Sequence, residues 1–142
     1  MNLRRIVVAY AGAALAFGAL DGVWLSATGG ALYRPALGPL LADQPRLAPA
    51  ALFYLIYFAG LCGFAVAPAL RSDRWTHAAR RGAGLGLVAY ATYDLTNQAT
   101  LSTWPAWLTA VDLAWGAFAS ACGATAGFFA AREARTRAAQ AG

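Results

Sequence analysis

Three aspartates, Asp21, Asp94 and Asp112, lie inside the most hydrophobic parts of this 142-residue chain. They make up half of its six acidic residues. A carboxyl group among apolar side chains is costly to desolvate, so such a residue usually faces a protein interior, a partner or a water-filled cavity. Acid–base chemistry, hydrogen bonding to a ligand and cation binding are the functions open to these three groups.

Aromatic and amide side chains accompany the aspartates at helical spacing. Trp24 follows Asp21 by three residues, and Asn97 follows Asp94 by three, so each pair shares a helix face. Asp94 is the expected general acid, supported by Asn97. The full catalytic set is Asp94, Asp21, Asp112 and Asn97, and the ligand-binding set is Trp24, Tyr54, Tyr57, Tyr90 and Trp115.

A purely structural role is the alternative for these residues. The aspartates can accept hydrogen bonds from Trp, Tyr and Asn across a helix bundle, and the aromatic rings can serve as core packing. Such bonds within membranes contribute about 0.6 kcal/mol each. That gain is small for three buried acids, because an asparagine would accept the same bonds at lower cost. The balance favours a function for the three aspartates, whereas packing is the favoured interpretation for Trp24, Trp115, Tyr54 and Tyr57.

Four hydrophobic blocks define the expected fold. The chain is 60% hydrophobic and 12% charged, whereas soluble domains carry about 25% charged residues. Each block has roughly the 20 residues that a helix needs to cross a bilayer. We therefore predict an all-α polytopic membrane protein with one domain over residues 1–142, an antiparallel bundle of four transmembrane helices. The expected spans are residues 6–28, 49–70, 83–101 and 105–131.

The first span follows Arg4 and Arg5, as a signal peptide would. It is too long for the apolar region of a signal peptide, and it contains Asp21. We expect a retained helix.

The distribution of arginine predicts the topology. All eleven basic residues are arginine, and nine of them flank the spans on one side. By the positive-inside rule that side is cytoplasmic, which places both termini and an Arg-rich tail over residues 132–142 there. The net charge of +5 then indicates contact with anionic lipid headgroups, and it requires no nucleic-acid partner. Residues 29–48 form the expected external loop.

The expected spans place the three aspartates at one depth. Asp21 lies seven residues before residue 28, Asp94 lies seven before residue 101, and Asp112 lies seven after residue 105. At 1.5 Å per residue, each carboxyl group lies about 10 Å below the outer boundary. The outer half of the bundle is therefore expected to enclose an acidic and aromatic layer.

Small residues recur at spacings that let helices approach closely in a bilayer. The first span carries Ala14, Gly18 and Gly22, and the fourth carries two such series. These faces can pack within one chain or form a homo-oligomer, and both alternatives stay open. The series in the fourth span are Gly116, Ser120 and Ala124, and Gly123 with Gly127.

Several strong motifs are missing from the sequence. It contains no glycine-rich phosphate loop, no histidine cluster and no Cys-x-x-Cys pair, and its one histidine, His77, is expected on the cytoplasmic side. Three carboxylates can hold a hard cation such as magnesium or calcium, but their spacing does not indicate a metal site. The metal and any cofactor are left open.

The expected helix pair over residues 83–131 carries a distinctive set of residues: Tyr90-Ala91-Thr92-Tyr93-Asp94-Leu95-Thr96-Asn97, Trp104 and Asp112-Leu113-Ala114-Trp115-Gly116. The first span adds Asp21-Gly22-Val23-Trp24-Leu25. With these motifs the chain resembles a bacterial four-helix membrane family, domain of unknown function 2177. The resemblance covers nearly the whole chain and implies a multi-pass protein of the bacterial inner (cytoplasmic) membrane, without an established activity.

Three functions compete on these residues. The favoured one is a protein that binds, or acts by acid–base chemistry on, a lipid-like or other hydrophobic small molecule that arrives from the bilayer. The second is a small proton- or cation-coupled transporter that works as an oligomer, although the half of the bundle nearer the arginines is poor in polar groups. The third is a non-catalytic scaffold or accessory subunit. Whether the protein is an enzyme is left open.

Overall fold

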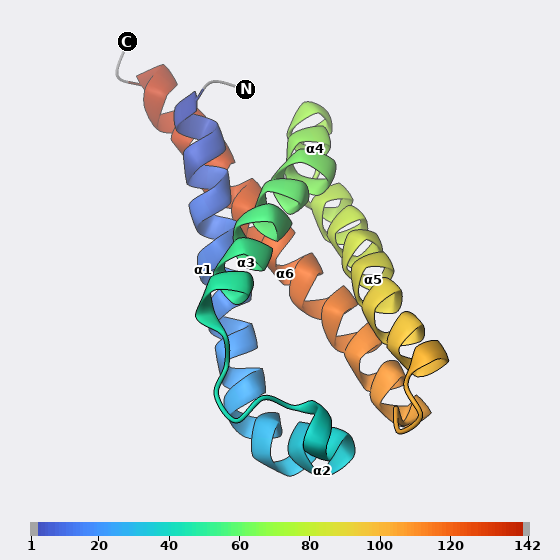
Figure 1. Ribbon diagram of the computed structural model, residues 1–142. Coiled ribbons are helices and arrows are strands. Elements are labelled where there is room, and N and C mark those ends of the chain that lie inside the picture. Colours follow the sequence, from blue (N-terminus) through green and yellow to red (C-terminus); the bar gives the residue numbers. More distant parts are fainter. Residues whose placement is uncertain (1–2, 141–142) are drawn as a thin grey trace.

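The protein is all-α, as predicted from the sequence (Figure 1). The computed structural model describes residues 3–140, apart from the side chains of Pro39, Ala138 and Ala139, and within that range it contains helices and turns only. The α-helices are α1 (Leu3–Thr28), α2 (Arg34–Leu37), α3 (Leu47–Leu61), α4 (Ala67–Ser72), α5 (Trp75–Thr100) and α6 (Ala106–Gln140). The π-helices η1 (Gly29–Tyr33) and η3 (Cys62–Val66) and the 3₁₀ helix η2 (Gly38–Leu40) connect some of them.

Three helical stretches among the described residues are long and apolar enough to cross a membrane: Leu3–Leu37, Leu47–Ser72 and Ala106–Arg137. The expected third span, residues 83–101, is not one of them. It belongs to α5, which begins at Trp75 and carries arginines in its first turns and polar side chains around Asp94. These residues lower the mean hydropathy of α5, so a fourth membrane crossing remains a prediction.

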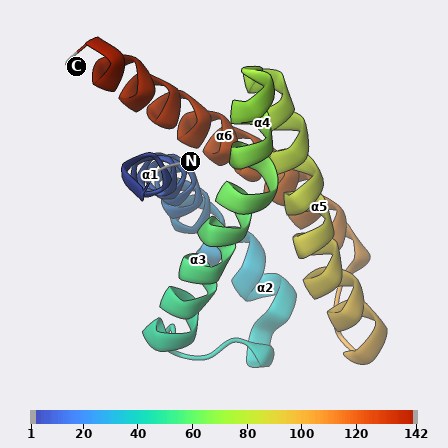
Figure 2. The same cartoon turned by 90° about the horizontal axis from the view of Figure 1, so that it is seen from above.

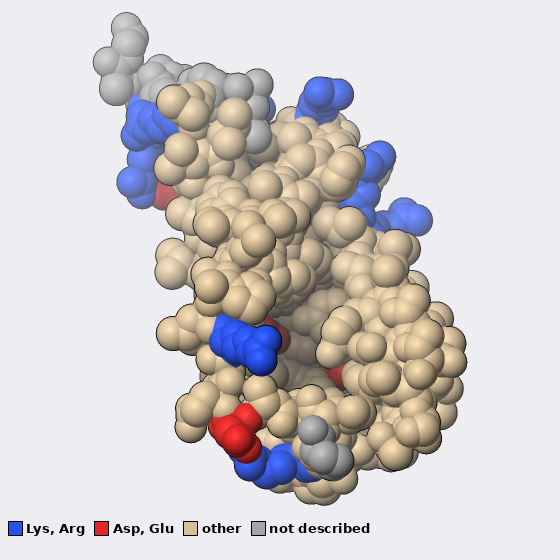
Figure 3. Space-filling view, viewed as in Figure 1, with Lys and Arg blue, Asp and Glu red and all other residues tan. Residues whose placement is uncertain are grey.

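The two ends of the molecule differ in charge. The start of α1, the end of α6 and the turn between α4 and α5 lie together at one end, which we call the arginine end because nine arginines lie there (Figures 1 and 3). The opposite end carries α2 and the turn between α5 and α6, and we call it the α2 end. The cytoplasmic location of the arginine end remains a prediction.

The expected external loop over residues 29–48 is largely helical. The first helix continues through η1 and α2 to Leu37, and an irregular segment follows only after Leu40. Pro35 lies in the first turn of α2, directly after η1, and its missing N–H group interrupts the helical hydrogen bonds at the point where the helix changes from π to α geometry. Gly38 has a φ of 45°, which favours glycine, and it ends this extension. The extension folds back over the α2 end of the bundle (Figure 1).

Pro68 explains the π-helix inside the second apolar stretch. It has no N–H group to donate to the carbonyl of Phe64 four residues earlier, and η3 lies at this point. The Arg81 guanidinium of α5 donates to the Phe64 carbonyl at 3.2 Å and replaces the missing bond. The helix axis changes direction here, so α3 crosses the bundle at a different angle from α4 (Figure 1).

The long helix α6 is the centre of the packing. Viewed from above, α1 and α5 stand apart, and α3 and α4 cross between them (Figure 2). Helix α6 runs behind α4 and α5 in this view and contacts both α1 and α5. Two faces of α6 form these contacts, one with α5 and the other with α1. Ser120 and Ala124 lie directly against Gly82 of α5, whereas Gly127 lies against the Ala9 carbonyl of α1. The small residues of the fourth apolar block therefore serve helix packing within the chain.

The small residues of α1 behave differently. A Cβ atom at Gly18 or Gly22 would meet no atom within 4 Å, whereas one at Gly12 would lie 2.9 Å from the Ala130 side chain. Gly18 and Gly22 thus make no close helix contact within the described chain. A homo-oligomer through this face remains a prediction.

Candidate functional site

All three aspartates are buried, and two of them, Asp21 and Asp112, accept hydrogen bonds from aromatic side chains. Their relative exposures are 7% for Asp21, 0% for Asp94 and 6% for Asp112. Asp21 points from α1 toward α3 and α6, while Asp94 of α5 lies beside Asp112 of α6. The expected single layer is therefore divided into an Asp21 cluster and an Asp94–Asp112 pair.

The Asp21 cluster joins three helices. Tyr54 of α3 donates its hydroxyl to Asp21 Oδ2 at 2.5 Å, and Trp115 of α6 donates its indole Nε1–H to Asp21 Oδ1 at 3.1 Å. Both carboxylate oxygens thus have a donor. This arrangement fixes the middle of α3 against α1 and α6, and it leaves Asp21 with a clear structural role.

The Asp112 carboxyl is tied to the extension of the first helix. Tyr33 of η1 donates its hydroxyl to Asp112 Oδ1, and Trp24 donates Nε1–H to the Tyr33 hydroxyl at 3.0 Å. Trp24 also stacks on Trp115, with ring centroids 4.4 Å apart and planes inclined by 10°. The indole pair therefore connects the Asp21 cluster to Asp112.

Asp94 differs from the other two aspartates because no donor reaches it. Both of its carboxylate oxygens are buried, and no N–H or O–H group of the described residues donates to either one. Its polar neighbour is the Asp112 carboxyl, which is itself an acceptor group when ionised. A buried acceptor without a donor costs about 1–3 kcal/mol, so the pair requires a proton or a ligand to supply one.

Asn97 does not support Asp94 in the way expected. It lies one turn further along α5, where its side chain interacts with Tyr93, and it makes no hydrogen bond to Asp94. The spacing of three residues places the two side chains on one helix face. However, Asp94 turns toward α6 and is fully buried, whereas Asn97 is half-buried.

Two of the three tyrosines expected to bind ligand, Tyr57 and Tyr90, occupy different environments. Tyr57 is buried, its hydroxyl lies 2.6 Å from Ser120 Oγ, and its ring packs against Phe17 at a centroid distance of 5.5 Å. It belongs to the core. Tyr90 is half-buried, and its ring packs directly on Gly116 of α6.

A hollow opens beside these residues. An apolar groove of about 390 Å³ between α3 and α5 is lined by Phe53, Ala89, Tyr90 and Tyr93. A pocket of about 490 Å³ at the α2 end contains Tyr93 again, and it reaches Asp112. Tyr93 therefore lines both spaces. Figure 3 shows the hollow between the helices, with acidic atoms inside it and charged atoms on its rim near α2.

Several lining residues were not predicted. Tyr33 was placed in a loop, whereas its helix continues from α1 and carries the hydroxyl group back to Asp112. Tyr93 and Trp104 meet edge-to-face at 5.8 Å beside the pocket. The glycine pair before Tyr33 was the one sequence feature that signalled a change in helical geometry. Nothing in the spacing identified Arg34 and Asp43 as pocket residues.

A metal site receives no support from the geometry. Within residues 3–140, no group of three or more His, Cys, Asp and Glu side chains is arranged to hold an ion. The division of the aspartates into a cluster and a pair accounts for this. The chemistry available at the site is proton transfer, hydrogen bonding and recognition of positive charge by carboxyl groups and aromatic rings.

The helices and the interior carboxyl groups define a helical membrane protein with a partly enclosed acidic and aromatic site. Residues 6–129 match the family model described as predicted membrane protein (DUF2177), and the chain belongs to that family. The family resemblance seen in the sequence is thereby confirmed. No curated protein and no solved structure matches the chain.

Proposed function

We propose that this protein binds a lipid-like molecule that enters from the bilayer between α3 and α5, and acts on it by acid–base chemistry at the Asp94–Asp112 pair. The observation that carries the proposal is the fully buried Asp94, whose carboxyl group receives no hydrogen bond. It lies beside Asp112, which lines the pocket at the α2 end. Unpartnered buried carboxyl groups in helical membrane proteins mark functional sites.

The position of the groove supports lateral entry. Phe53 and Tyr93 face each other across it, and their exposed fractions are 46% and 61%. The exposed sides of α3 and α5 here are apolar, as a surface in contact with acyl chains must be. A hydrophobic molecule can therefore reach the interior without crossing the polar ends of the bundle.

The two carboxyl groups of the pair have different access. Asp112 borders the pocket and can touch a ligand, whereas Asp94 is closed off from it. A proton held between the two satisfies Asp94, and Asp112 then delivers it to a ligand atom or takes one up. Asp112 is thus the group that meets the ligand, and Asp94 is a positioning residue that keeps the proton available.

Transport has less support than binding. Within the described part of the chain, the buried polar residues other than these aspartates are Thr109 and Ser120. Toward the arginine end, the interior consists of Ala, Leu, Val and Phe side chains. A path for protons or ions across the bundle would need polar groups there. A scaffold role would require neither the unpaired Asp94 nor the hollow.

Native mass spectrometry with lipid extraction tests the proposal on the wild type and the Asp94→Asn variant. The amide can donate to Asp112, so this variant should fold while the pair loses its shared proton. Asp73→Asn is the matched control because Asp73 lies at the arginine end, where it pairs with Arg132 and Arg135 and does not contact the site. The proposal expects a defined lipid-like molecule that is retained by the wild type and the control and lost from Asp94→Asn.

Two results would contradict it. One is a folded wild type from which no lipid-like molecule is recovered. The other is equal retention of the molecule by the wild type and Asp94→Asn, which would show that binding does not depend on the Asp94–Asp112 pair.

A further inference from the structure

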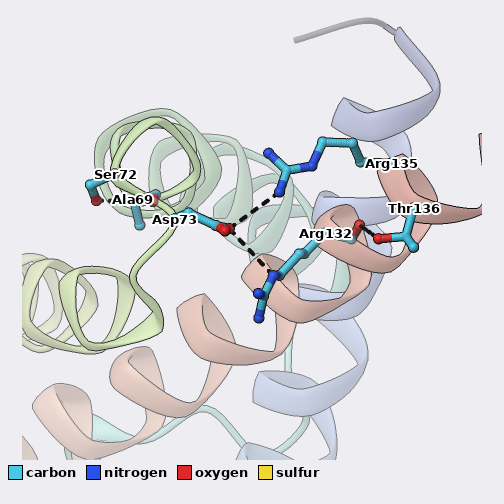
Figure 4. Close-up of polar contacts among 6 residues, drawn as sticks. All are labelled: Ala69, Ser72, Asp73, Arg132, Arg135 and Thr136. Atoms are coloured by element: carbon cyan, nitrogen blue, oxygen red, sulfur yellow. Dashed lines mark hydrogen bonds and ion pairs between the residues drawn. The ribbon is translucent and has the colours of Figure 1, made fainter. Parts of the chain in front are cut away.

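The pocket at the α2 end contains both signs of charge. Arg34 of α2 and Asp43 of the following connection line it together with Asp112. Neither Arg34 nor Asp43 forms an ion pair within the described residues, and both are exposed. By contrast, Asp73 at the arginine end is paired with Arg132 and Arg135 (Figure 4). The charges at the pocket are therefore available to a ligand.

Aromatic rings stand next to these charges. Tyr33, Tyr93 and Trp104 all line the same pocket. The Trp104 indole is held in place because its Nε1–H donates to Thr109 Oγ1 at 3.0 Å, and Thr109 donates to Gln98 at 2.9 Å. Carboxylates combined with the faces of fixed aromatic rings are the typical environment of an alkylammonium group. A guanidinium group is the usual partner of a phosphate.

Tyr93 lines both this pocket and the apolar groove between α3 and α5. A molecule that fills both spaces must have a hydrophobic chain at one end and a head that carries an anionic and a cationic group at the other. Phospholipids with an ammonium-bearing headgroup have this composition. Phosphate contact at Arg34 and ammonium contact at Asp43 and Trp104 would place the headgroup next to Asp112.

We propose that the ligand of this site is a zwitterionic phospholipid selected by its ammonium group. The proposal rests on the proposed function and names the class of molecule that the acidic pair would meet. Selection comes from the pocket at the α2 end, since the groove between α3 and α5 distinguishes only apolar chains.

Competition between two lipids tests the selection. Purified protein is incubated with equal amounts of phosphatidylethanolamine and phosphatidylglycerol that carry identical acyl chains, and bound lipid is counted by native mass spectrometry. Both lipids have one phosphate, and they differ in the head alcohol, which is a cationic ethanolamine in the first and an uncharged glycerol in the second. We expect about a tenfold preference for phosphatidylethanolamine, the effect of one good ammonium site.

Variants separate the parts of the pocket. Asp43→Asn and Trp104→Leu should reduce the preference to nearly equal binding. Arg34→Gln should weaken both lipids while the preference remains. Asp73→Asn and Trp107→Leu are matched controls: Asp73 lies at the other end, and Trp107 is an exposed neighbour in the same turn region that does not line the pocket. Neither control should change the preference.

Three outcomes are informative. A preference that falls in Asp43→Asn or Trp104→Leu but not in the controls supports the inference. Equal binding of the two lipids by the wild type, with both lost from Asp94→Asn, overturns the ammonium selection and leaves the lipid site intact. Binding of neither lipid to a folded wild type overturns the inference together with the proposed function.

Discussion

Replacement of Gly82 by alanine should separate α5 from α6. An added Cβ atom would lie 2.5 Å from the Ser120 backbone oxygen and 2.7 Å from Ala124 Cβ. Carbon atoms pack best at about 3.5–4.0 Å. Because the obstacles are a backbone oxygen and a Cβ atom, no flexible side chain can move aside, and α5 must shift by about 1 Å.

The matched control is Gly84→Ala in the same helix. A Cβ atom at Gly84 would meet nothing within 4 Å. Both substitutions favour the helix by up to about 1 kcal/mol, so their difference isolates the packing cost. Inserting a carbon into a packed contact costs about 1–3 kcal/mol. Gly82→Ala should therefore be less stable than Gly84→Ala by that amount.

Thermal unfolding in detergent, followed by tryptophan fluorescence, measures the difference. Trp75, Trp104 and Trp115 lie on or beside the two helices and report their separation. The unfolding temperature of Gly84→Ala should equal or exceed that of the wild type. The unfolding temperature of Gly82→Ala should be several degrees lower than that of Gly84→Ala. Equal unfolding temperatures for the two variants would show that α5 and α6 do not approach as closely as the structure indicates.

Three further predictions concern the hydrogen bonds and ion pairs. Tyr33→Phe removes the donor to Asp112; the helix extension should loosen, and amide hydrogen exchange over residues 29–40 should rise while that of α3 stays unchanged. Trp24→Phe breaks the indole stack on Trp115, so the exciton signal of a coupled tryptophan pair in circular dichroism should vanish, and its persistence would place the pair elsewhere. Asp73→Asn removes the partner of two half-exposed arginines; unfolding stability should fall by less than about 1 kcal/mol, and a larger loss would mean that the contact is shielded from water.

The all-helical fold and the burial of the aspartates could be predicted, because the length of each apolar segment and the position of a charged residue within it are local properties of the sequence. Asp21, Asp94 and Asp112 stand out against apolar neighbours, and all three are buried. Trp115 proved to contact an aspartate, although its partner is Asp21 of another helix and not Asp112 of its own face. Spacing along one helix identifies shared faces, but it does not say which helix the face meets.

The rest of the site depends on long-range geometry. Tyr33 reaches Asp112 only because η1 prolongs the first helix past its two glycines. The depth argument predicts three carboxyl groups at one level, but depth does not fix rotation about each helix axis. Rotation pairs Asp94 with Asp112 and directs Asp21 toward Tyr54 instead.

The opening of the site follows from one proline and one arginine at a distance from it. Pro68 interrupts the second apolar stretch, and η3 lets the chain change direction there. Arg81 secures the exposed Phe64 carbonyl, so the bend is attached to α5 near the arginine end. Beyond the bend, α3 leans toward α1, where Tyr54 binds Asp21, and away from α5. The groove between α3 and α5 lies on this side of the bend and is lined by Tyr90 and Tyr93. We expect Pro68→Ala to restore the helical hydrogen bond to Phe64, straighten the helix and narrow the groove, so this variant should retain less lipid although no residue of the site is altered.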